Sequence, residues 1–340
     1  MKKILALLLA LWIPAAVLSG CAPQNDSAAS NKLNIVTTIF PAYDWVREIL
    51  GDETDRAEIT TLLDSGVDLH SYQPTVDDIV KISECDLFLY VGGESDGWVE
   101  DALKNAPNKD RKVIRLLDVL GDSAKAEETV EGMQEEEHDH EEEEHDHEEE
   151  EHGHEEEAEY DEHIWLSLKN AQKLVAAISE ALQETDPARK DTYAANAAAY
   201  VEKLSALDGE YRAAVDSGTY KTLLFGDRFP FRYLADDYGL DYYAAFPGCS
   251  AETEASFETV SFLAGKMDAL GLPCVLTIEG TQHKIAETIV QNTAKKNQQV
   301  LTMDSMQAVT ANDASSGVSY LSIMEKNLSV LKKALGQEAE

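Results

Sequence analysis

ARKDTYAANAAAYVEKLSALDGEYRAAV, residues 188–215, is the stretch that decides the fold. Good helix formers follow one another here with no interior proline, so we expect a single helix over Pro187–Ser217. That length exceeds the usual helix of a globular domain. Its simplest use is as a rigid support between two lobes, which the sequence on either side should then form. A shorter helical stretch, Leu166–Glu184, leads into it.

Strand-like and helix-like runs alternate on both sides of this helix. The predicted strands are Leu33–Thr38, Ala57–Leu63, Asp86–Val91 and Lys112–Leu117 before it, and Lys221–Phe225, Asp241–Ala245, Cys274–Ile278 and Gln299–Met303 after it. The predicted helices between them are Tyr43–Leu50, the run capped by Thr75, Trp98–Leu103, Phe229–Tyr238, Ser256–Leu270, Ile285–Lys296 and Tyr320–Leu335. This alternation predicts parallel sheets covered by helices. The fold class is therefore α/β, with two lobes, residues 33–183 and 218–340, joined by one long rigid helix, 187–217.

The first 32 residues read as an export signal and a tether. Lys2 and Lys3 precede an apolar run, Ile4–Val17, that is too short for a comfortable membrane span. The run ends in LSGC, which resembles a bacterial lipobox with Cys21 as the lipidated residue; the alternative is an ordinary signal with a chance cysteine. We expect residues 1–20 to be a lipoprotein signal peptide and 21–32 a flexible tether. The protein would then be anchored to the outer face of the bacterial cell membrane without spanning it.

The chain is strongly acidic, but much of its charge is local. The formal net charge is −37, and 22 of the 65 acidic residues lie between Glu127 and Glu162, leaving 43 acidic against 28 basic residues elsewhere. This balance disfavours binding to nucleic acid or to anionic lipid.

That acidic segment also contains six histidines in HxH pairs. They are His138, His140, His145, His147, His152 and His154. Such a composition cannot form a core, so residues 127–160 are predicted to be a disordered, solvated loop of the first lobe. Imidazole is the commonest side-chain ligand for zinc, so the loop indicates capture of a transition metal. The alternative is a plain acidic spacer, which would not need the histidines.

Two other histidines lie in predicted strand-to-helix connections. His70 lies in GVDLHSYQPTVDDI and His163 in DEHIWLSLKNA. Ligands gather at the carboxyl ends of parallel strands, so both are candidate metal ligands, although a single loop histidine is more often merely exposed. The cysteines Cys85, Cys249 and Cys274 allow at most one disulfide, and no CxxC spacing indicates a thiolate zinc site. Whether Cys249 and Cys274 are bridged is left open.

The two stretches that contain His70 and His163 resemble motifs of a known family. This family is the metal-binding lipoproteins that serve ABC importers of zinc and manganese, the cluster A-I type of solute-binding protein. The two stretches are similar to the family's G-x-D-P-H-x-[YF]-[EQ]-P-[ST] and D-P-H-[VI]-W-[LM]-[DS]-P-x-N-A patterns. Further matches are IVTTIFPAYDWVREILGD, DLFLYVGGE and DDYGL, so the resemblance runs from about Leu33 to the C-terminus. It implies a single ion in the cleft between the lobes, with His70 and His163 as the N-terminal ligand pair.

For the C-terminal pair the resemblance implies Asp304, in LTMDSM, and one residue of FGDRFPFRYLADDYGL. The family's H-[DT]-A-[FW]-x-Y pattern puts its ligand at Arg228, which cannot coordinate a metal. Pro230 could shift the register by one residue, which makes Asp227 the predicted third ligand. Its alternative role is to cap the next helix, and Glu279 is the alternative oxygen donor.

The resemblance implies zinc or manganese as the ion, and we expect zinc, with manganese as the alternative. The predicted carboxylates favour manganese or iron, whereas the histidine-rich loop favours zinc and is given more weight. The partners implied are an ABC permease and its ATPase, and the carrier is expected to be a monomer. No HExxH, nucleophile elbow or P-loop spacing occurs, so an enzyme such as a zinc hydrolase is not expected. A surface adhesin with a structural metal is the remaining alternative.

Overall fold

The computed structural model describes residues 32–104, 107–134, 159–250, 254–280 and 283–337, all within one compact unit, Lys32–Glu340. Several predictions fall outside these residues: the signal peptide, most of the tether with Cys21, and the histidine-rich part of the acidic loop with His138, His140, His145, His147, His152 and His154. Within the described residues, no helix has the length and apolar character needed to cross a membrane.

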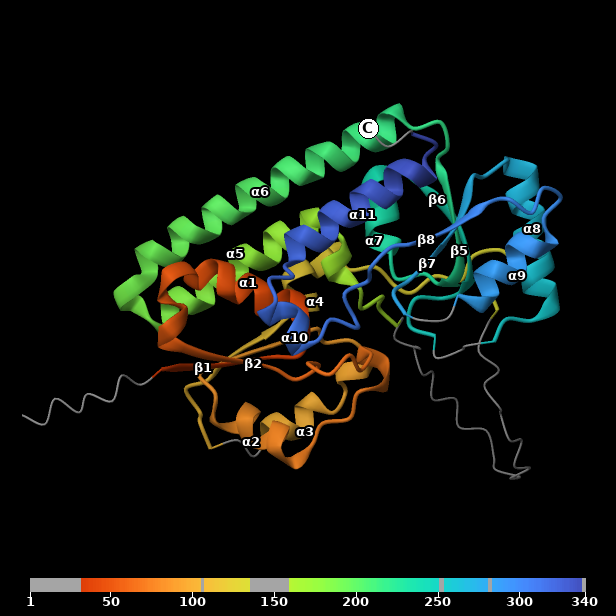
Figure 1. Ribbon diagram of the computed structural model, residues 1–340. Coiled ribbons are helices and arrows are strands. Elements are labelled where there is room, and N and C mark those ends of the chain that lie inside the picture. Colours follow the sequence, from red (N-terminus) through yellow and green to blue (C-terminus); the bar gives the residue numbers. More distant parts are fainter. Residues whose placement is uncertain (1–31, 105–106, 135–158, 251–253, 281–282, 338–340) are drawn as a thin grey trace, which may run out of the picture. The chain divides into compact units, whose positions relative to one another are not determined.

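The long helix is present as α6, Lys190–Ser217, preceded by a 3-10 turn at Pro187–Arg189. Its buried residues recur every three or four positions and so form one face: Tyr193, Ala197, Tyr200, Leu204, Leu207, Tyr211 and Ala214. This face packs on α5 (Leu168–Thr185), α1 (Phe40–Leu50) and α11 (Tyr320–Ala334), as Figure 1 shows. The Tyr211 hydroxyl donates to the Met324 carbonyl oxygen at 2.7 Å, which ties α6 to α11.

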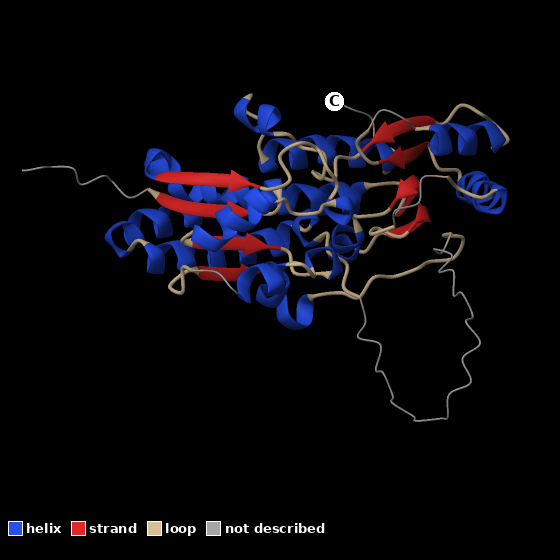
Figure 2. Cartoon of the chain, turned by 90° about the horizontal axis from the view of Figure 1, so that it is seen from below, coloured by secondary structure: helices blue, strands red, loops and turns tan. Residues whose placement is uncertain are grey.

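Two four-stranded parallel sheets form the two lobes (Figure 2). The first has the order β2-β1-β3-β4 and consists of β1 (Leu33–Thr37), β2 (Ala57–Thr61), β3 (Leu87–Tyr90) and β4 (Lys112–Arg115). The second has the order β6-β5-β7-β8 and consists of β5 (Thr222–Arg228), β6 (Asp241–Phe246), β7 (Cys274–Thr277) and β8 (Gln299–Thr302). The two orders are the same when the strands of each sheet are counted along the chain, so each strand has a counterpart in the other lobe. The predicted fold class is confirmed.

The remaining helices cover the sheets and their edges. They are α2 (Val76–Glu84), α3 (Val99–Lys104), α4 (Leu116–Leu120), α7 (Arg232–Tyr238), α8 (Phe257–Leu270), α9 (Lys284–Asn292) and α10 (Ala311–Ser315). Thr75 caps α2 as predicted, in a reciprocal capping box with Asp78.

Several boundaries differ from the prediction, and the following differences bear on the predicted ligands or on the sheets. The fourth strand stops at Arg115, because Leu116, Leu117 and Leu120 have helical spacing and bury one face of α4. The helix expected from Phe229 begins only at Arg232, and β5 continues to Arg228 through an irregular register with β6. Asp227 is therefore a strand residue and does not cap that helix. The short helix α10 was not predicted.

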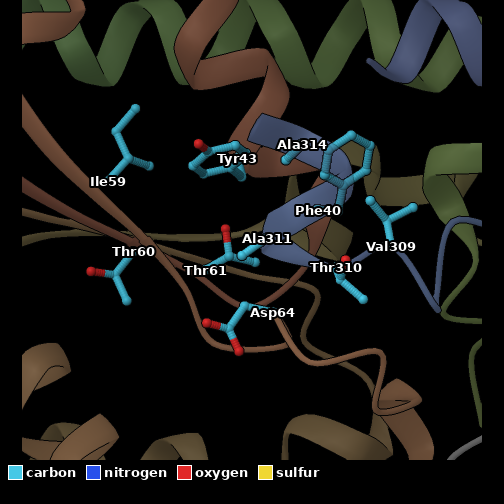
Figure 3. Close-up of a pocket in the computed structure, with 10 residues that line it drawn as sticks. All are labelled: Phe40, Tyr43, Ile59, Thr60, Thr61, Asp64, Val309, Thr310, Ala311 and Ala314. Atoms are coloured by element: carbon cyan, nitrogen blue, oxygen red, sulfur yellow. The ribbon is translucent and has the colours of Figure 1, made fainter. Parts of the chain in front are cut away.

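A half-open hollow of about 270 Å³ lies between the first lobe and the segment that carries α10 (Figure 3). Its lining includes Phe40 and Tyr43 of α1 and Val309 and Ala314 of the α10 segment. Backbone bonding closes its lower edge, where the Ala311 N–H donates to the Asp64 carbonyl oxygen at 2.8 Å. Its lining has one carboxylate and no imidazole or thiol, so its donor set does not suit a transition metal.

Candidate metal centre

His70 is placed by a short turn that follows β2. Asp68 accepts the backbone N–H of His70 at 3.0 Å and so starts the 3-10 turn Leu69–Ser71, whose Leu69 side chain is buried in the core. The ring Nδ1 lies 2.9 Å from the hydroxyl of Ser95, which follows β3. With Nδ1 engaged on this side, Nε2 points away from it and is available to a ligand.

His163 is placed by a second turn of the same design. Asp161, two residues before it, accepts both the His163 backbone N–H at 2.8 Å and, with the same oxygen, the ring Nδ1 at 3.0 Å. The imidazole is fully buried. In both turns an aspartate accepts the backbone N–H of the histidine two residues later. At His163 the aspartate also holds the ring, as carboxylates behind metal-binding histidines often do.

The two Nε2 atoms, from His70 and His163, lie 3.2 Å apart. Two nitrogens bound to one tetrahedral zinc at 2.0–2.1 Å would lie about 3.4 Å apart. The pair is therefore spaced almost as a single ion requires, in a position reached only because residues 93 apart in the sequence meet.

Glu162 lies beside the Nδ1 side of His70, away from the two Nε2 atoms. Its Oε1 accepts the Ser95 N–H at 2.8 Å, and its Oε2 lies 3.3 Å from Nδ1 of His70. Burial alone would raise the pKa of Glu162, but the contacts with His70 and Ser95 outweigh it and hold that pKa below its ordinary value. The carboxylate is therefore ionised and adds negative potential beside the imidazoles.

Cys249 is the residue that the sequence analysis missed. Among the described residues, one group of three potential ligands has its donor atoms within 4.8 Å of one another, and it consists of His70, His163 and Cys249. Burial, followed by the charges of Asp161 and Glu127, raises the pKa of the Cys249 thiol far above its ordinary value. No CxxC spacing marked this cysteine, because its two neighbours come from the other lobe.

The predicted C-terminal carboxylates do not join that group. Asp227 accepts backbone N–H groups of Arg228 at 2.9 Å and of Ile278 at 3.3 Å, and burial raises its pKa. Asp304 accepts the N–H of Met306 at 2.8 Å; burial, and then the charge of Glu279, raise its pKa to about 6.

Glu279 is the most heavily bonded of these carboxylates. It accepts the Ser305 N–H at 2.6 Å, the Ser305 hydroxyl at 2.7 Å and the Gln307 N–H at 3.0 Å. These bonds hold the turn after β8 against the end of β7.

Arg228, at the position where the motif places a ligand, forms a bridge between the lobes. Its guanidinium binds the Asp68 carboxylate at 2.5 Å and donates to the Ser250 carbonyl oxygen at 3.2 Å. The bridge therefore ties the turn that carries His70 to the residue that follows Cys249.

A half-open hollow of about 370 Å³ gives access to the group. His70 and Cys249 lie in its lining, together with Trp98 and the carboxylates Glu127, Glu159 and Glu162. The Glu127 N–H donates to the Glu159 carbonyl oxygen at 2.7 Å, so the chain returns from the histidine-rich segment at the rim of this hollow. It leaves for that segment from the second lobe, where the Gln134 N–H donates to the Ala245 carbonyl oxygen at 2.9 Å and Met133 is buried. The prediction of a disordered loop of the first lobe is therefore wrong for residues 127–134.

The described cysteines Cys85, Cys249 and Cys274 are all free thiols. The question of a bridge between Cys249 and Cys274 is thereby answered: the structure has none. Cys85 and Cys274 are buried, and burial raises the pKa of each thiol to about 12.

Comparison with known proteins gives the same architecture. A model of the family described as zinc-uptake complex component A, periplasmic (ZnuA), matches residues 35–334. The zinc-binding lipoprotein AdcA of Streptococcus pneumoniae is 33% identical over 338 residues, which cover 99% of this chain but only 62% of AdcA. The high-affinity zinc uptake system protein ZnuA of Bacillus subtilis is 30% identical over 311 residues, covering 92% of this chain and 90% of that protein.

Solved structures agree in fold. The zinc-bound ZnuA-like domain of S. pneumoniae AdcA superposes with a TM-score of 0.68 at 28% identity, covering 90% of this chain and all of that one. The metal-dependent lipoprotein YcdH of B. subtilis superposes with a TM-score of 0.69 at 25% identity, covering 89% of this chain and 99% of that one.

Proposed function

Because the chain belongs to the ZnuA family of zinc-uptake components, we propose that it is an extracytoplasmic solute-binding lipoprotein that captures zinc and delivers it to an ABC permease. The observation that carries this proposal is the His70–His163 pair, whose Nε2 atoms lie 3.2 Å apart. The ring Nδ1 of each is turned to a fixed partner, and neutral imidazoles held in this way are good zinc ligands. The protein acts as a carrier and has no catalytic role.

Capture is a two-stage process in this proposal. The six histidines between His138 and His154 bind zinc weakly and reversibly, which raises the local zinc concentration at the rim formed by Glu127 and Glu159. The ion then passes through the acidic hollow to His70 and His163. Carboxylates along that path attract a divalent cation and disfavour anions.

Delivery requires a membrane anchor and a partner. The relative AdcA is a zinc-binding lipoprotein, and the LSGC sequence ending at Cys21 offers this chain the same attachment. The anchored carrier would dock as a monomer on a permease, whose associated ATPase drives transport. The sequence-based ligands Asp227, Asp304 and Glu279 stay predictions, because their carboxylates lie outside the group formed by His70, His163 and Cys249.

The test is native mass spectrometry with metal analysis and zinc titration of the full chain. Replacing both His70 and His163 by alanine should remove one tightly bound zinc while leaving the weak loop sites. His283 is the matched control, since it is the third described histidine and lies outside the ligand group. If the double variant kept its tight zinc, or lost no more of it than His283→Ala does, the proposed site would be wrong.

Deletion of residues 135–157 tests the division of labour. The variant should bind fewer zinc ions in total, retain one tight site, and support slower uptake when zinc is scarce. Loss of the tight site on deletion would show that the loop is part of it. Manganese titration of the same variant measures whether manganese, the alternative ion, competes at the tight site.

A further inference from the structure

We infer that Cys249 is the third protein ligand of the ion, and that this ligand makes the site selective for zinc over manganese. The free thiol is protonated, and it releases its proton to solvent as the sulfur binds the cation. The inference rests on the proposed function and deepens it. It replaces the C-terminal carboxylate expected from the family motif with a sulfur donor from a different strand end.

The symmetry of the two lobes favours this position. His70 follows β2, the edge strand of the order β2-β1-β3-β4. Cys249 follows β6, the edge strand that occupies the same place in the order β6-β5-β7-β8. Equivalent strand ends of the two lobes therefore present the two donors, and both carboxyl ends are where ligands gather in parallel sheets.

The distances also suit one ion. Sulfur and nitrogen ligands of a tetrahedral zinc, at about 2.3 and 2.05 Å, lie about 3.6 Å from each other. The donor atoms of His70, His163 and Cys249 already lie within 4.8 Å of one another. To bind the same ion, the Cys249 sulfur has to approach the two imidazoles, and rotation of its side chain is the movement that a fixed backbone allows.

The loop that carries Cys249 is held against the imidazoles. The Cys249 N–H donates to Glu127 at 2.8 Å, and Arg228 holds the next carbonyl oxygen, that of Ser250, at 3.2 Å. Gly248 lies so close to His163 that a β-carbon there would be 3.2 Å from the ring atoms. These contacts fix the backbone on both sides of the thiol, as expected of a ligand placed by its surroundings.

Arg228 explains why a different ligand is needed. A guanidinium cannot bind a metal, and here it is engaged with Asp68 at 2.5 Å. The position given by the motif is thereby used for holding the lobes together, and the adjacent loop provides the donor. Thiolate is a soft ligand that suits zinc, whereas manganese prefers oxygen donors, so this exchange favours zinc.

Cobalt(II) substitution tests the ligand directly, because a cobalt-bound thiolate gives a charge-transfer band in the near ultraviolet that nitrogen and oxygen ligands do not. All variants carry Cys21→Ser so that the N-terminal thiol contributes nothing. The parent should show the band, Cys249→Ser should lose it, and Cys274→Ser, which removes another buried thiol, should keep it. A band that persists in Cys249→Ser, or that is absent from the parent, overturns the inference.

The affinities of the variants for zinc and for manganese provide a second, independent test. Cys249→Ser should lower zinc affinity by at least the 10- to 100-fold typical of losing an outer-shell partner, with little change for manganese. Cys249→Asp, with a hard donor of similar size, should recover affinity but narrow the preference for zinc, without the cobalt band. Zinc affinity within twofold of the parent in Cys249→Ser would overturn the inference, whereas retention of tight zinc by the double histidine variant would instead overturn the proposed site.

Discussion

The two lobes share one strand order but use their strand ends differently. In the N-terminal lobe, two Asp-x-His turns direct His70 and His163 toward each other, and their Nε2 atoms lie 3.2 Å apart. In the C-terminal lobe, the carboxylates at the ends of β5 and β7, and in the turn after β8, are turned back onto backbone N–H groups of their own lobe. One lobe presents donors to an ion, while the other uses most of its donors to hold its loops.

This difference separates prearranged ligands from supporting groups. A buried carboxylate that already accepts two or three hydrogen bonds, as those of Asp227 and Glu279 do, gains less from a metal than an imidazole whose free nitrogen has only another imidazole beside it. From the C-terminal lobe, the residue whose donor atom lies with those of His70 and His163 is Cys249. The following changes break or sharpen the comparison, beginning with the largest expected effect.

Asp161→Ala should break the N-terminal half of the site. The substitution removes the acceptor of both the backbone N–H and the ring Nδ1 of His163, leaving the buried imidazole unoriented. We expect zinc affinity to fall by about 100-fold, at the upper end for an outer-shell partner. Zinc titration measures it, and Asp101→Ala, which removes an exposed aspartate of α3, is the control.

Asp161→Asn separates geometry from charge at the same position. The amide oxygen can still accept the two bonds, but the negative charge that strengthens the His163 imidazole is lost. We expect a loss of about 10-fold. Affinity within twofold of the parent in Asp161→Ala would contradict the view that this lobe prearranges its ligands.

Asp44→Asn tests a contact between helices α1 and α11, where the Asp44 carboxylate accepts the Tyr320 N–H at 2.8 Å. Burial, partly opposed by this bond, raises the pKa of Asp44 from 3.8 to about 6. Ionisation of Asp44 therefore lowers the free energy of unfolding. The loss begins as the pH rises above about 3.8 and is complete above about pH 6. Asparagine imitates the neutral acid, so the variant should gain up to about 3 kcal/mol over the parent at pH 7 and almost nothing at pH 3.5.

Denaturant unfolding at both pH values, with a chelator present, measures that difference. Glu48→Gln, a more exposed acid on the same helix, serves as the control. A stability gain that is the same at pH 3.5 and pH 7 would show that Asp44 is not the group responsible.

Much of the fold was readable because its signals are local. The long helix and the alternation of strands and helices depend on neighbouring residues, and the structure has both. The strand-to-helix change at Arg115 was missed because the leucines of LLDVL suit a buried strand as well as the buried face of α4. The group at Cys249 could not be predicted, because it forms only when loops after β2 and β6 meet.

The C-terminal carboxylates show a second thing that a sequence motif cannot predict, namely which group a side chain faces. A motif can place Asp227 or Asp304 at a strand end, but whether the side chain faces an ion or a backbone N–H depends on neighbours far along the chain, such as Ile278 for Asp227. Arg228 was recognised as unable to bind a metal. Its partner Asp68, 160 residues away, gives that departure its structural reason.

Arg228→Met should loosen the C-terminal half of the site. It removes the bridge between Asp68 and the Ser250 carbonyl oxygen while keeping a long apolar side chain. Because the pair is partly exposed, we expect a loss of about 1–2 kcal/mol, seen as a roughly 10-fold faster dissociation of zinc. Stopped-flow chelator competition measures this rate, and Arg56→Met, an exposed arginine paired with Glu53, is the control. An unchanged rate would mean that the bridge does not position the Cys249 loop.

Asp304→Asn and Asp227→Asn should have the smallest effects on the ion. In Asp304→Asn the amide oxygen can keep the bond from the Met306 N–H. The amide oxygen at position 227 can keep the bond from the Ile278 N–H, while the local bond from the Arg228 N–H is lost. Zinc affinity should change by less than about threefold, or about 0.7 kcal/mol, because neither side chain belongs to the ligand group. Burial raises the pKa of both groups, so removing their charge should raise the free energy of unfolding at pH 7. A 10-fold or greater loss of zinc affinity in either variant would instead assign that carboxylate to the ion and make the two lobes equal contributors.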